Sequence, residues 1–394
     1  MGRRDVLAGS LAAAAGLGAA RRQGPSRVIR LGVIGCGQRG SWIAGLFRRH
    51  GGYVVHAVAD YFEDVADRCG EALEVPKARR FFGLDGYKRL IESGVDAVAL
   101  ETPPYCFPLH AETAVAAGLH VFMAKPVAVD VPGCKRVEAA AKKASTSKLV
   151  FLVDYQMPTD PANRRVVEMV RNGAIGRVVA VHSYYLAGSW PDPPKTATIE
   201  DRLQKLIWVN DTAIGSGYHG NACIHAVDAA MWALGKTPSA AMGASLIGRP
   251  DPHGDSHDVL SITYEFDGGL ILNHRAKHLP DSFSTADFCG CYLHGDKGYA
   301  WISYSAKAQL VSPDEAVRED VVNLYEAGAV RNIAAFHEAI ATGDTANPTV
   351  RRAIDSALVT IMGREAAQRR TRLTLSEVLK QNRSLRLSLA GLRR

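Results

Sequence analysis

The chain has 394 residues, of which 47% are hydrophobic and 22% charged, a composition that is ordinary for a globular protein with room for two domains. The formal net charge is +7, but residues 1–27 hold five arginines and one aspartate and so supply most of it. The remaining charge is small and scattered, which argues against a nucleic-acid partner.

Residues 1–27 have the pattern of an export signal. Arg3 and Arg4 precede an apolar stretch, rich in alanine and glycine, that runs from Val6 to Ala20. This stretch is too short to span a bilayer comfortably. We therefore expect export by the twin-arginine machinery, to the periplasm or to a membrane anchor that faces outward. A disordered alanine-rich tail is the alternative.

A glycine motif follows the first predicted strand, at residues 28–34. Gly35, Gly37 and Gly40 form a Gly-x-Gly-x-x-Gly sequence that leads into a predicted helix at 41–50. In this setting the first glycine makes a tight turn, the second lets the backbone approach a pyrophosphate, and the third lets the helix pack on the strand. The N–H groups at the start of the helix would bind the phosphates.

The second predicted strand, at residues 53–59, ends at Asp60. A carboxylate at this distance from the glycine motif would bind a ribose hydroxyl of a dinucleotide. Because a carboxylate repels a 2′-phosphate, Asp60 favours NAD over NADP, while Arg39 in the glycine loop leaves NADP open. The alternative is a glycine turn in an ordinary α/β fold without a ligand.

Short apolar runs alternate with helical segments up to residue 153, which predicts an α/β domain with a doubly wound parallel sheet over residues 28–153. Strands are expected at 28–34, 53–59, 97–100, 120–123 and 149–153, and helices at 41–50, 63–73, 86–93, 107–117 and 133–145.

Residues 154–380 have a different pattern, which predicts an α+β domain with a mostly antiparallel open sheet and helices on one face. Strands are expected at 178–185, 240–247, 257–266, 269–276 and 287–294, and helices at 161–172, 218–234, 329–342, 350–367 and 375–379. Residues 381–394 form a tail, and we expect a cleft between the two domains.

Two segments carry side chains that are suited to proton transfer. Lys125 follows a predicted sheet strand, where ligands of open α/β sheets bind and where burial would lower the pKa of a lysine. In the predicted helix at 218–234, Asn221, His225 and Asp228 lie on one face, which would give the histidine polar neighbours. A solvated surface lysine and a satisfied core histidine are the alternatives.

The seven cysteines are spread along the chain. Their spacing indicates neither a disulfide framework nor a metal site. We therefore expect no bound metal, including at Cys289-x-Cys291, and we interpret most of the cysteines as small core residues.

Together these motifs resemble the Gfo/Idh/MocA family of nicotinamide-dependent sugar oxidoreductases, which is named after glucose–fructose oxidoreductase and inositol dehydrogenase. The resemblance covers residues 28 to about 380, and the N-terminal segment is similar to that of an exported subgroup. It rests on the glycine motif with Asp60, Glu101-Thr102-Pro103-Pro104, His110, Ala116-Ala117-Gly118, Lys125-Pro126, Asn172-Gly173-Ala174-Ile175-Gly176, Ile224-His225-x-x-Asp228, and Ile361-Met362-Gly363-Arg364.

The resemblance implies an N-terminal Rossmann domain that holds NAD tightly, and hydride transfer to or from a sugar, cyclitol or polyol carbon. Lys125 would orient and deprotonate the substrate hydroxyl, His225 would be the main acid–base group, and Asn221 would assist. The residues expected to bind the cofactor are Gly35, Gly37, Gln38, Arg39, Gly40, Asp60, Thr102, Pro103 and Lys125. The residues expected to bind the carbohydrate are Tyr155, Gln156, Trp208, Tyr218, His219 and Asp228. It also implies a homo-oligomer.

Two positions differ from the pattern of the family. Residue 124 is alanine where the family usually has the glutamate of Glu-Lys-Pro, and Asn221 stands where a carboxylate is common. These differences motivate one alternative function, a sugar- or nucleotide-binding relative with impaired turnover. The other alternative is an NAD-dependent glycoside-cleaving enzyme that oxidises a sugar hydroxyl, eliminates the aglycone and then returns the hydride.

Overall fold

The computed structural model describes residues 28–279 and 287–394. The predicted export signal, residues 1–27, lies outside the described residues. Among the helices of the described ranges, none has both the length and the apolar character needed to cross a membrane.

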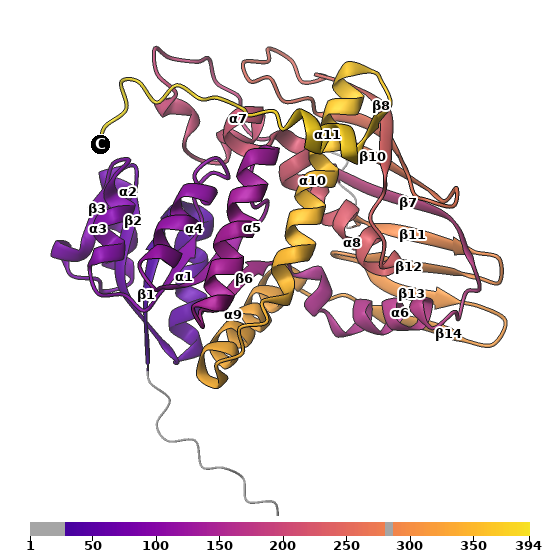
Figure 1. Ribbon diagram of the computed structural model, residues 1–394, viewed down its shortest axis with the longest axis horizontal. Helices are drawn as coiled ribbons and strands as arrows, with labels where there is room; N and C mark the ends of the chain where they lie inside the picture. The colour runs from indigo at the N-terminus through magenta and orange to yellow at the C-terminus, as the bar shows by residue number, and fades with distance from the viewer. Residues whose placement is uncertain (1–27, 280–286) are drawn as a thin grey trace, which may run out of the picture.

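The first domain is built on a six-stranded parallel sheet with the strand order β3-β2-β1-β4-β5-β6 (Figure 1). Its strands are β1 (Ile29–Ile34), β2 (Tyr53–Asp60), β3 (Arg80–Phe82), β4 (Ala97–Leu100), β5 (His120–Ala124) and β6 (Phe151–Asp154). Its helices are α1 (Gln38–His50), α2 (Glu63–Ala72), α3 (Gly86–Glu92), α4 (Phe107–Ala116) and α5 (Val131–Thr146), with a short 3-10 turn η1 (Lys77–Arg79).

This strand order confirms the predicted doubly wound fold. The order reverses between β1 and β4, and ligands of such sheets bind beyond the carboxyl ends of the strands at that point. Leu31, Val33, Val98 and Leu100 are each fully buried, because helices cover both faces of the sheet. The sequence analysis did not predict β3, whose three residues are only half-buried and too few to form a pattern.

The second domain contains a nine-stranded sheet in the order β14-β13-β12-β11-β7-β10-β9-β8-β15. Its strands are β7 (Val178–Ala187), β8 (Ala240–Leu246), β9 (Val259–Glu265), β10 (Ile271–His278), β11 (Cys289–Gly295), β12 (Tyr299–Ser303), β13 (Lys307–Val311), β14 (Ala316–Asp320) and β15 (Leu373–Thr374). All described neighbours are antiparallel except β7 and β10, which confirms the mostly antiparallel sheet that was predicted.

The helices after β6 are α6 (Pro161–Arg171), α7 (Thr212–Gly215), α8 (Ile224–Leu234), α9 (Leu324–Thr342), α10 (Pro348–Arg369) and α11 (Leu375–Gln381), with 3-10 turns η2 (Met157–Thr159), η3 (Glu200–Arg202) and η4 (Ile207–Asn210). Of these, α6, α8 and α10 pack on one side of the second sheet (Figure 1). The segment η5 (His219–Cys223) is a π-helix that leads into α8. The sequence analysis treated 218–234 as one α-helix, so it missed this local change of helical pitch.

The last helices and the tail tie the two domains together. Helix α9 returns to the first domain, where Phe336 packs edge-on against Phe122 of β5 with ring centroids 5.7 Å apart. Residues 382–394 run back over the same domain, and the yellow tail in Figure 1 ends beside α2 and β3. There the backbone N–H of Leu84 donates to the carbonyl oxygen of Arg393, and the N–H of Arg393 donates to the Tyr61 hydroxyl.

Candidate active site

A cavity of about 1600 Å³ opens at the carboxyl ends of the first sheet and extends to the second domain. Its lining includes the glycine loop, the ends of β2, β4 and β5, residues of η5 and the start of α8, and part of the C-terminal tail. The cavity brings together the following residues that were predicted from the sequence: Gly35, Gly37, Gln38, Arg39, Gly40, Asp60, Thr102, Pro103, Lys125, Gln156, Trp208, Asn221 and His225.

The geometry of the glycine loop fits a dinucleotide. Gly35 has φ +96°, and a Cβ there would lie 2.6 Å from the backbone of Glu101. A Cβ on Gly40 would lie 1.7 Å from the carbonyl oxygen of Gly35, so only glycine lets α1 approach β1 this closely. At Gly37 a Cβ would meet no atom within 4 Å, and the first N–H groups of α1 therefore remain accessible to a phosphate.

Asp60, at the end of β2, lies beside the glycine loop. One carboxylate oxygen accepts the N–H of Cys36 at 2.7 Å, and the other accepts the N–H of Phe62 at 3.0 Å. Burial raises the pKa of this carboxyl, although the two N–H groups oppose the shift. Each oxygen keeps a free lone pair, so the carboxylate can still accept a ribose hydroxyl.

Arg39 points from the glycine loop toward the ends of β4 and β6. Its guanidinium pairs with Glu101 at 3.0 Å and with Asp154 at 2.5 Å, and it donates to the Tyr325 hydroxyl at 2.9 Å. Burial opposes the charge, but the two carboxylates keep the pKa of Arg39 above its usual value. A guanidinium that is engaged in this way is not held beside Asp60, where a 2′-phosphate would lie.

A buried carboxylate lies next to the alanine at position 124. Strands β4 and β5 pair Leu100 with Met123, so the next residues, Glu101 and Ala124, are neighbours. The Glu101 side chain is 0% exposed, and burial raises its pKa to about 7. Its Oε1 has no hydrogen-bond partner in the described part of the chain. Glu101 of the neighbouring strand thus places a carboxylate beside position 124, where the family usually has a glutamate.

Lys125 extends from the end of β5 to the helix of the second domain. Its ammonium donates to the backbone oxygen of Asn221 over 2.6 Å. Burial, together with the positive charge of Arg39, lowers the pKa of Lys125 to about 7, and Asp154 and Glu101 limit the shift. Near neutral pH a substantial fraction of this lysine is therefore uncharged and can accept a proton.

His225 faces the same cavity from α8, one turn beyond Asn221. Burial lowers its pKa well below the usual value, and the charges of Lys125 and Arg39 lower it further. Its ring packs against Tyr304, with centroids 5.3 Å apart. The imidazole is therefore neutral at pH 7 and able to accept or share a proton.

The structure does not bring Asp228 to the cavity. It is 1% exposed and pairs with Arg352 of α10 while it accepts the Ser356 hydroxyl at 2.7 Å. The face of α8 that carries Asp228 packs against α10, and a buried carboxylate needs such a charged partner. The predicted role of Asp228 in substrate binding is therefore corrected to an ion pair between helices.

Three aromatic candidates also lie outside the cavity lining. Tyr155 packs beside His225, with centroids 6.2 Å apart, and is 5% exposed. The Tyr218 hydroxyl donates to the carbonyl oxygen of Lys277 at 2.7 Å, and His219 contacts the Tyr264 hydroxyl at 2.7 Å. The π-turn directs His219 toward the sheet, a direction that an α-helical pattern does not predict.

The sequence analysis missed the acidic partners of Arg39. Glu101 and Asp154 each stand at the carboxyl end of a strand, which is the signal that identified Lys125. Asp154 also accepts the Gln156 amide at 2.6 Å, and Gln156 in turn accepts the Tyr304 hydroxyl at 3.1 Å. Only the folded chain shows that Arg39 links these groups.

Comparison with known families agrees with this geometry. Residues 29–152 match an oxidoreductase family with an NAD-binding Rossmann fold, and residues 163–300 match the GFO/IDH/MocA C-terminal domain. The two matches span about two thirds of the chain, which therefore carries both domains of the Gfo/Idh/MocA oxidoreductase family. The first domain is thus an NAD-binding domain.

Individual relatives are distant. Inositol 2-dehydrogenase 2 of Saccharopolyspora erythraea is 28% identical over 251 residues, which are 62% of this chain and 65% of the relative, just under two thirds of its length. A levoglucosan dehydrogenase in complex with NADH and L-sorbose has a TM-score of 0.73 at 18% identity and covers 89% of this chain and 99% of its own. Aldose-aldose oxidoreductase from Caulobacter crescentus, complexed with glycerol, has a TM-score of 0.71 at 20% identity, covering 88% and 100%.

Proposed function

We propose that this two-domain protein is an NAD-dependent oxidoreductase that transfers hydride to or from a CH–OH carbon of a sugar, cyclitol or polyol. The observation that carries the proposal is the shared cavity in which Lys125 and His225 face the glycine loop. The relatives that act on inositol and levoglucosan, by their names, support this substrate class.

Different side chains of the cavity would serve different steps of an alcohol oxidation. Bound NAD⁺ would supply the hydride acceptor at its nicotinamide. Lys125 in its neutral form would take the proton of the substrate hydroxyl as the same carbon loses its hydride, so that the CH–OH group becomes a carbonyl group. The resulting ammonium is stabilised by the backbone oxygen of Asn221 and by the nearby Glu101 and Asp154. His225 accepts or returns a proton from the same side.

Glu101 and Arg39 serve this reaction indirectly. Burial is the main cause of the lowered pKa of Lys125, and within this setting Arg39 lowers the pKa further while Glu101 raises it. We assign Glu101 the role of a positioning residue in place of the glutamate that position 124 lacks. This assignment argues against impaired turnover, the alternative that Ala124 and Asn221 motivate.

The cofactor is held tightly in this proposal. The tail residues Leu389, Leu392 and Arg394 line the cavity together with Asp60 and Gly83, on the side of the adenosine half. Arg393 further binds Glu63 and stacks over the Phe82 ring at 4.4 Å. NAD is preferred over NADP, because Asp60 repels a 2′-phosphate and Arg39 is engaged elsewhere.

The test is an assay of the purified protein with NAD⁺ and a panel of aldoses, inositols, polyols, anhydrosugars and aryl glycosides. Net NADH formation with a member of the panel, at a rate that falls by about 10²–10⁴-fold in Lys125→Met, supports the proposal. Release of an aglycone without net NADH would instead show the glycoside-cleaving alternative. Cofactor binding without either reaction would show a binding protein with lost turnover.

We also propose that the protein is exported, on the strength of Arg3, Arg4 and the apolar stretch that follows them. Mass spectrometry of the mature N-terminus from the native host tests this, since an intact first segment on a cytoplasmic protein would contradict it.

We further propose self-association through the open face of the second sheet. The register places Met242, Leu246 and Ile271 on that face, where they are 47%, 51% and 39% exposed. Native mass spectrometry is expected to show a dimer or tetramer, and a monomer at all concentrations would contradict this.

A further inference from the structure

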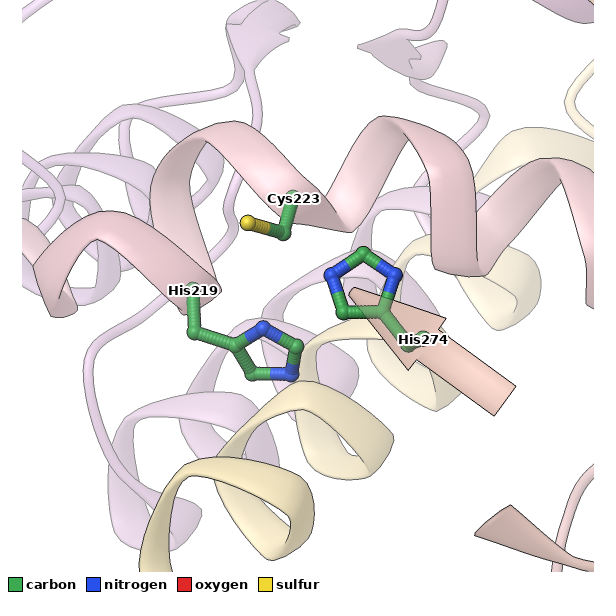
Figure 2. Close-up of side chains that lie close together, drawn as sticks. All are labelled: His219, Cys223 and His274. Atoms are coloured by element: carbon green, nitrogen blue, oxygen red, sulfur yellow. The ribbon is translucent and has the colours of Figure 1, made fainter. Parts of the chain in front are cut away.

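A second cluster of chemically reactive side chains lies inside the second domain, behind the helix that carries Asn221 and His225. His219 and Cys223 come from the π-helix η5, and His274 comes from β10 (Figure 2). The candidate ligand atoms all lie within 4.8 Å of one another. The three residues are at most 1% exposed, so no part of the cluster belongs to the cavity surface.

In each imidazole of the cluster, the ring nitrogen that faces away from the other candidate ligands contacts a hydroxyl group, which orients the ring. Nε2 of His219 contacts the Tyr264 hydroxyl at 2.7 Å, and Nδ1 of His274 contacts the Ser183 hydroxyl at 2.8 Å. The remaining nitrogens, Nδ1 of His219 and Nε2 of His274, have no hydrogen-bond partner in residues 28–279 and 287–394. Figure 2 shows these two nitrogens facing the space between the two rings, with the sulfur of Cys223 lying beside the same space.

Such an arrangement is unusual for a core. Buried polar atoms almost always have a partner, and two that face each other beside a thiol require an explanation. Metal-binding histidines typically use one ring nitrogen as the ligand while the other is held by a hydrogen bond, as both rings are here. π-Turns are likewise frequent at functional sites.

We propose that His219, Cys223 and His274 bind one thiophilic d¹⁰ metal ion through Nδ1, Sγ and Nε2. Imidazole nitrogen and thiolate sulfur are ligands that Cu⁺ and Zn²⁺ prefer. Bonds of about 2.0–2.3 Å to such an ion place neighbouring ligand atoms about 3.3–3.9 Å apart. To bind the ion, the most widely separated ligand atoms would therefore have to move about 1 Å closer to each other, and rotation of the side chains can provide this movement.

The charges around the cluster favour Cu⁺ over Zn²⁺. Binding releases the proton of the Cys223 thiol to solvent and forms a thiolate, so two neutral imidazoles and one thiolate give a neutral complex with Cu⁺ and a net charge of +1 with Zn²⁺. The positive charges near the cluster, Arg364 toward His219 and Lys125 toward Cys223, disfavour an additional buried charge. A three-coordinate site also suits Cu⁺ better than Zn²⁺, which usually takes four ligands.

A metal here would connect the π-helix to the second sheet. Cys223 lies two residues beyond Asn221, so the ion would fix the start of the helix that faces the cavity. The cysteine spacing predicted no metal, and the sequence does not reveal this cluster because His274 is about 50 residues from the other two ligands and the fold alone brings the three together.

The experiment uses the full chain, stripped of metal under reducing conditions and then given one equivalent of Zn²⁺ or, without oxygen, of Cu⁺. After desalting, the bound metal is counted, and X-ray absorption identifies its ligands. We expect about one Cu⁺ per chain with one sulfur and two nitrogen ligands, weaker retention of Zn²⁺, and a melting temperature about 3 °C or more higher with metal.

Two variants and one control decide the assignment. Cys223→Ser and His274→Asn should each lose the ion, while Cys291→Ser, which removes a buried thiol outside the cluster, should keep it. If a variant fails to fold, the ligand set of the wild-type protein still decides. Retention of neither ion, metal ligation without sulfur, or equal retention by Cys223→Ser would overturn the proposal.

Discussion

The reactivity of the cavity depends at the residue scale on how far Lys125 is desolvated. Its pKa falls to about 7 because burial outweighs the two carboxylates nearby. The lysine at this strand end was predicted from the sequence, but its pKa was not, because Arg39, Glu101 and Asp154 come from three separate strand ends or loops. Glu101 and Ala124 each follow directly on the paired residues Leu100 and Met123, which explains how the chain retains a carboxylate there.

Replacing the lysine tests its role. Lys125→Met should lower kcat/KM by about 10²–10⁴-fold, since the substrate hydroxyl loses its proton acceptor. The protein should still fold and bind NAD, which calorimetry measures. The exposed Lys142→Met is the matched control and should keep full activity. A Lys125→Met variant with more than a tenth of wild-type activity would exclude this residue as the base.

The pH profile tests the charge network. Because neutral Lys125 accepts the proton, kcat/KM for oxidation should rise as the pH increases through about 7. Glu101 raises the pKa of Lys125, so Glu101→Gln should shift this rise to lower pH. The control, Glu112→Gln, removes a carboxylate that pairs with Arg136 and should leave the profile in place. A shift to higher pH in Glu101→Gln would refute the assigned role.

At the scale of elements, most of the first domain was predictable because its strands are apolar runs that are buried on both faces. The second domain was harder. Its strands β12, β13 and β14 went unpredicted, since two thirds of their residues are partly or fully exposed and the pattern is weak. The π-helix η5 was missed as well, and with it the true direction of His219. Tertiary packing, rather than local pattern, decides these elements.

The contact between α1 and β1 gives an element-scale prediction. Gly40→Ala should destabilise the first domain by about 1–3 kcal/mol and weaken NAD binding, because the new Cβ would lie 1.7 Å from the carbonyl oxygen of Gly35. In the same helix, Gly45→Ala meets no atom within 4 Å and should be neutral or stabilise by about 0.5–1 kcal/mol. Urea unfolding and NAD titration measure both, and equal behaviour of the two variants would contradict the account.

At the scale of the whole molecule, the C-terminal tail forms one side of the cofactor cleft. The tail at residues 381–394 and the cleft were each predicted from the sequence. The position of the tail over the cleft, however, depends on contacts between residues more than 300 positions apart in the chain, such as Arg393 and Tyr61. No local pattern encodes such a contact. The tail therefore adds a wall to the cavity that the sequence did not indicate.

Removing the tail tests its function. Deletion of residues 383–394 should raise the Kd for NAD by about tenfold, equivalent to about 1.4 kcal/mol, because the cavity loses Leu389, Leu392 and Arg394. The KM for the sugar should stay within about twofold, because its proposed site beside Lys125 and His225 is not formed by the tail residues Leu389, Leu392 and Arg394. Unchanged NAD affinity would show that the tail does not hold the cofactor.

The most direct test of the central claim follows the hydride itself. Sugars, inositols and anhydrosugars that carry deuterium on their CH–OH carbons are incubated with the protein and NAD⁺, and the cofactor is examined by mass spectrometry. We expect deuterium in the nicotinamide for at least one substrate class with the wild-type protein, and uptake about 10²–10⁴-fold slower with Lys125→Met. A cofactor that binds but takes up no deuterium from any of these substrates would contradict it.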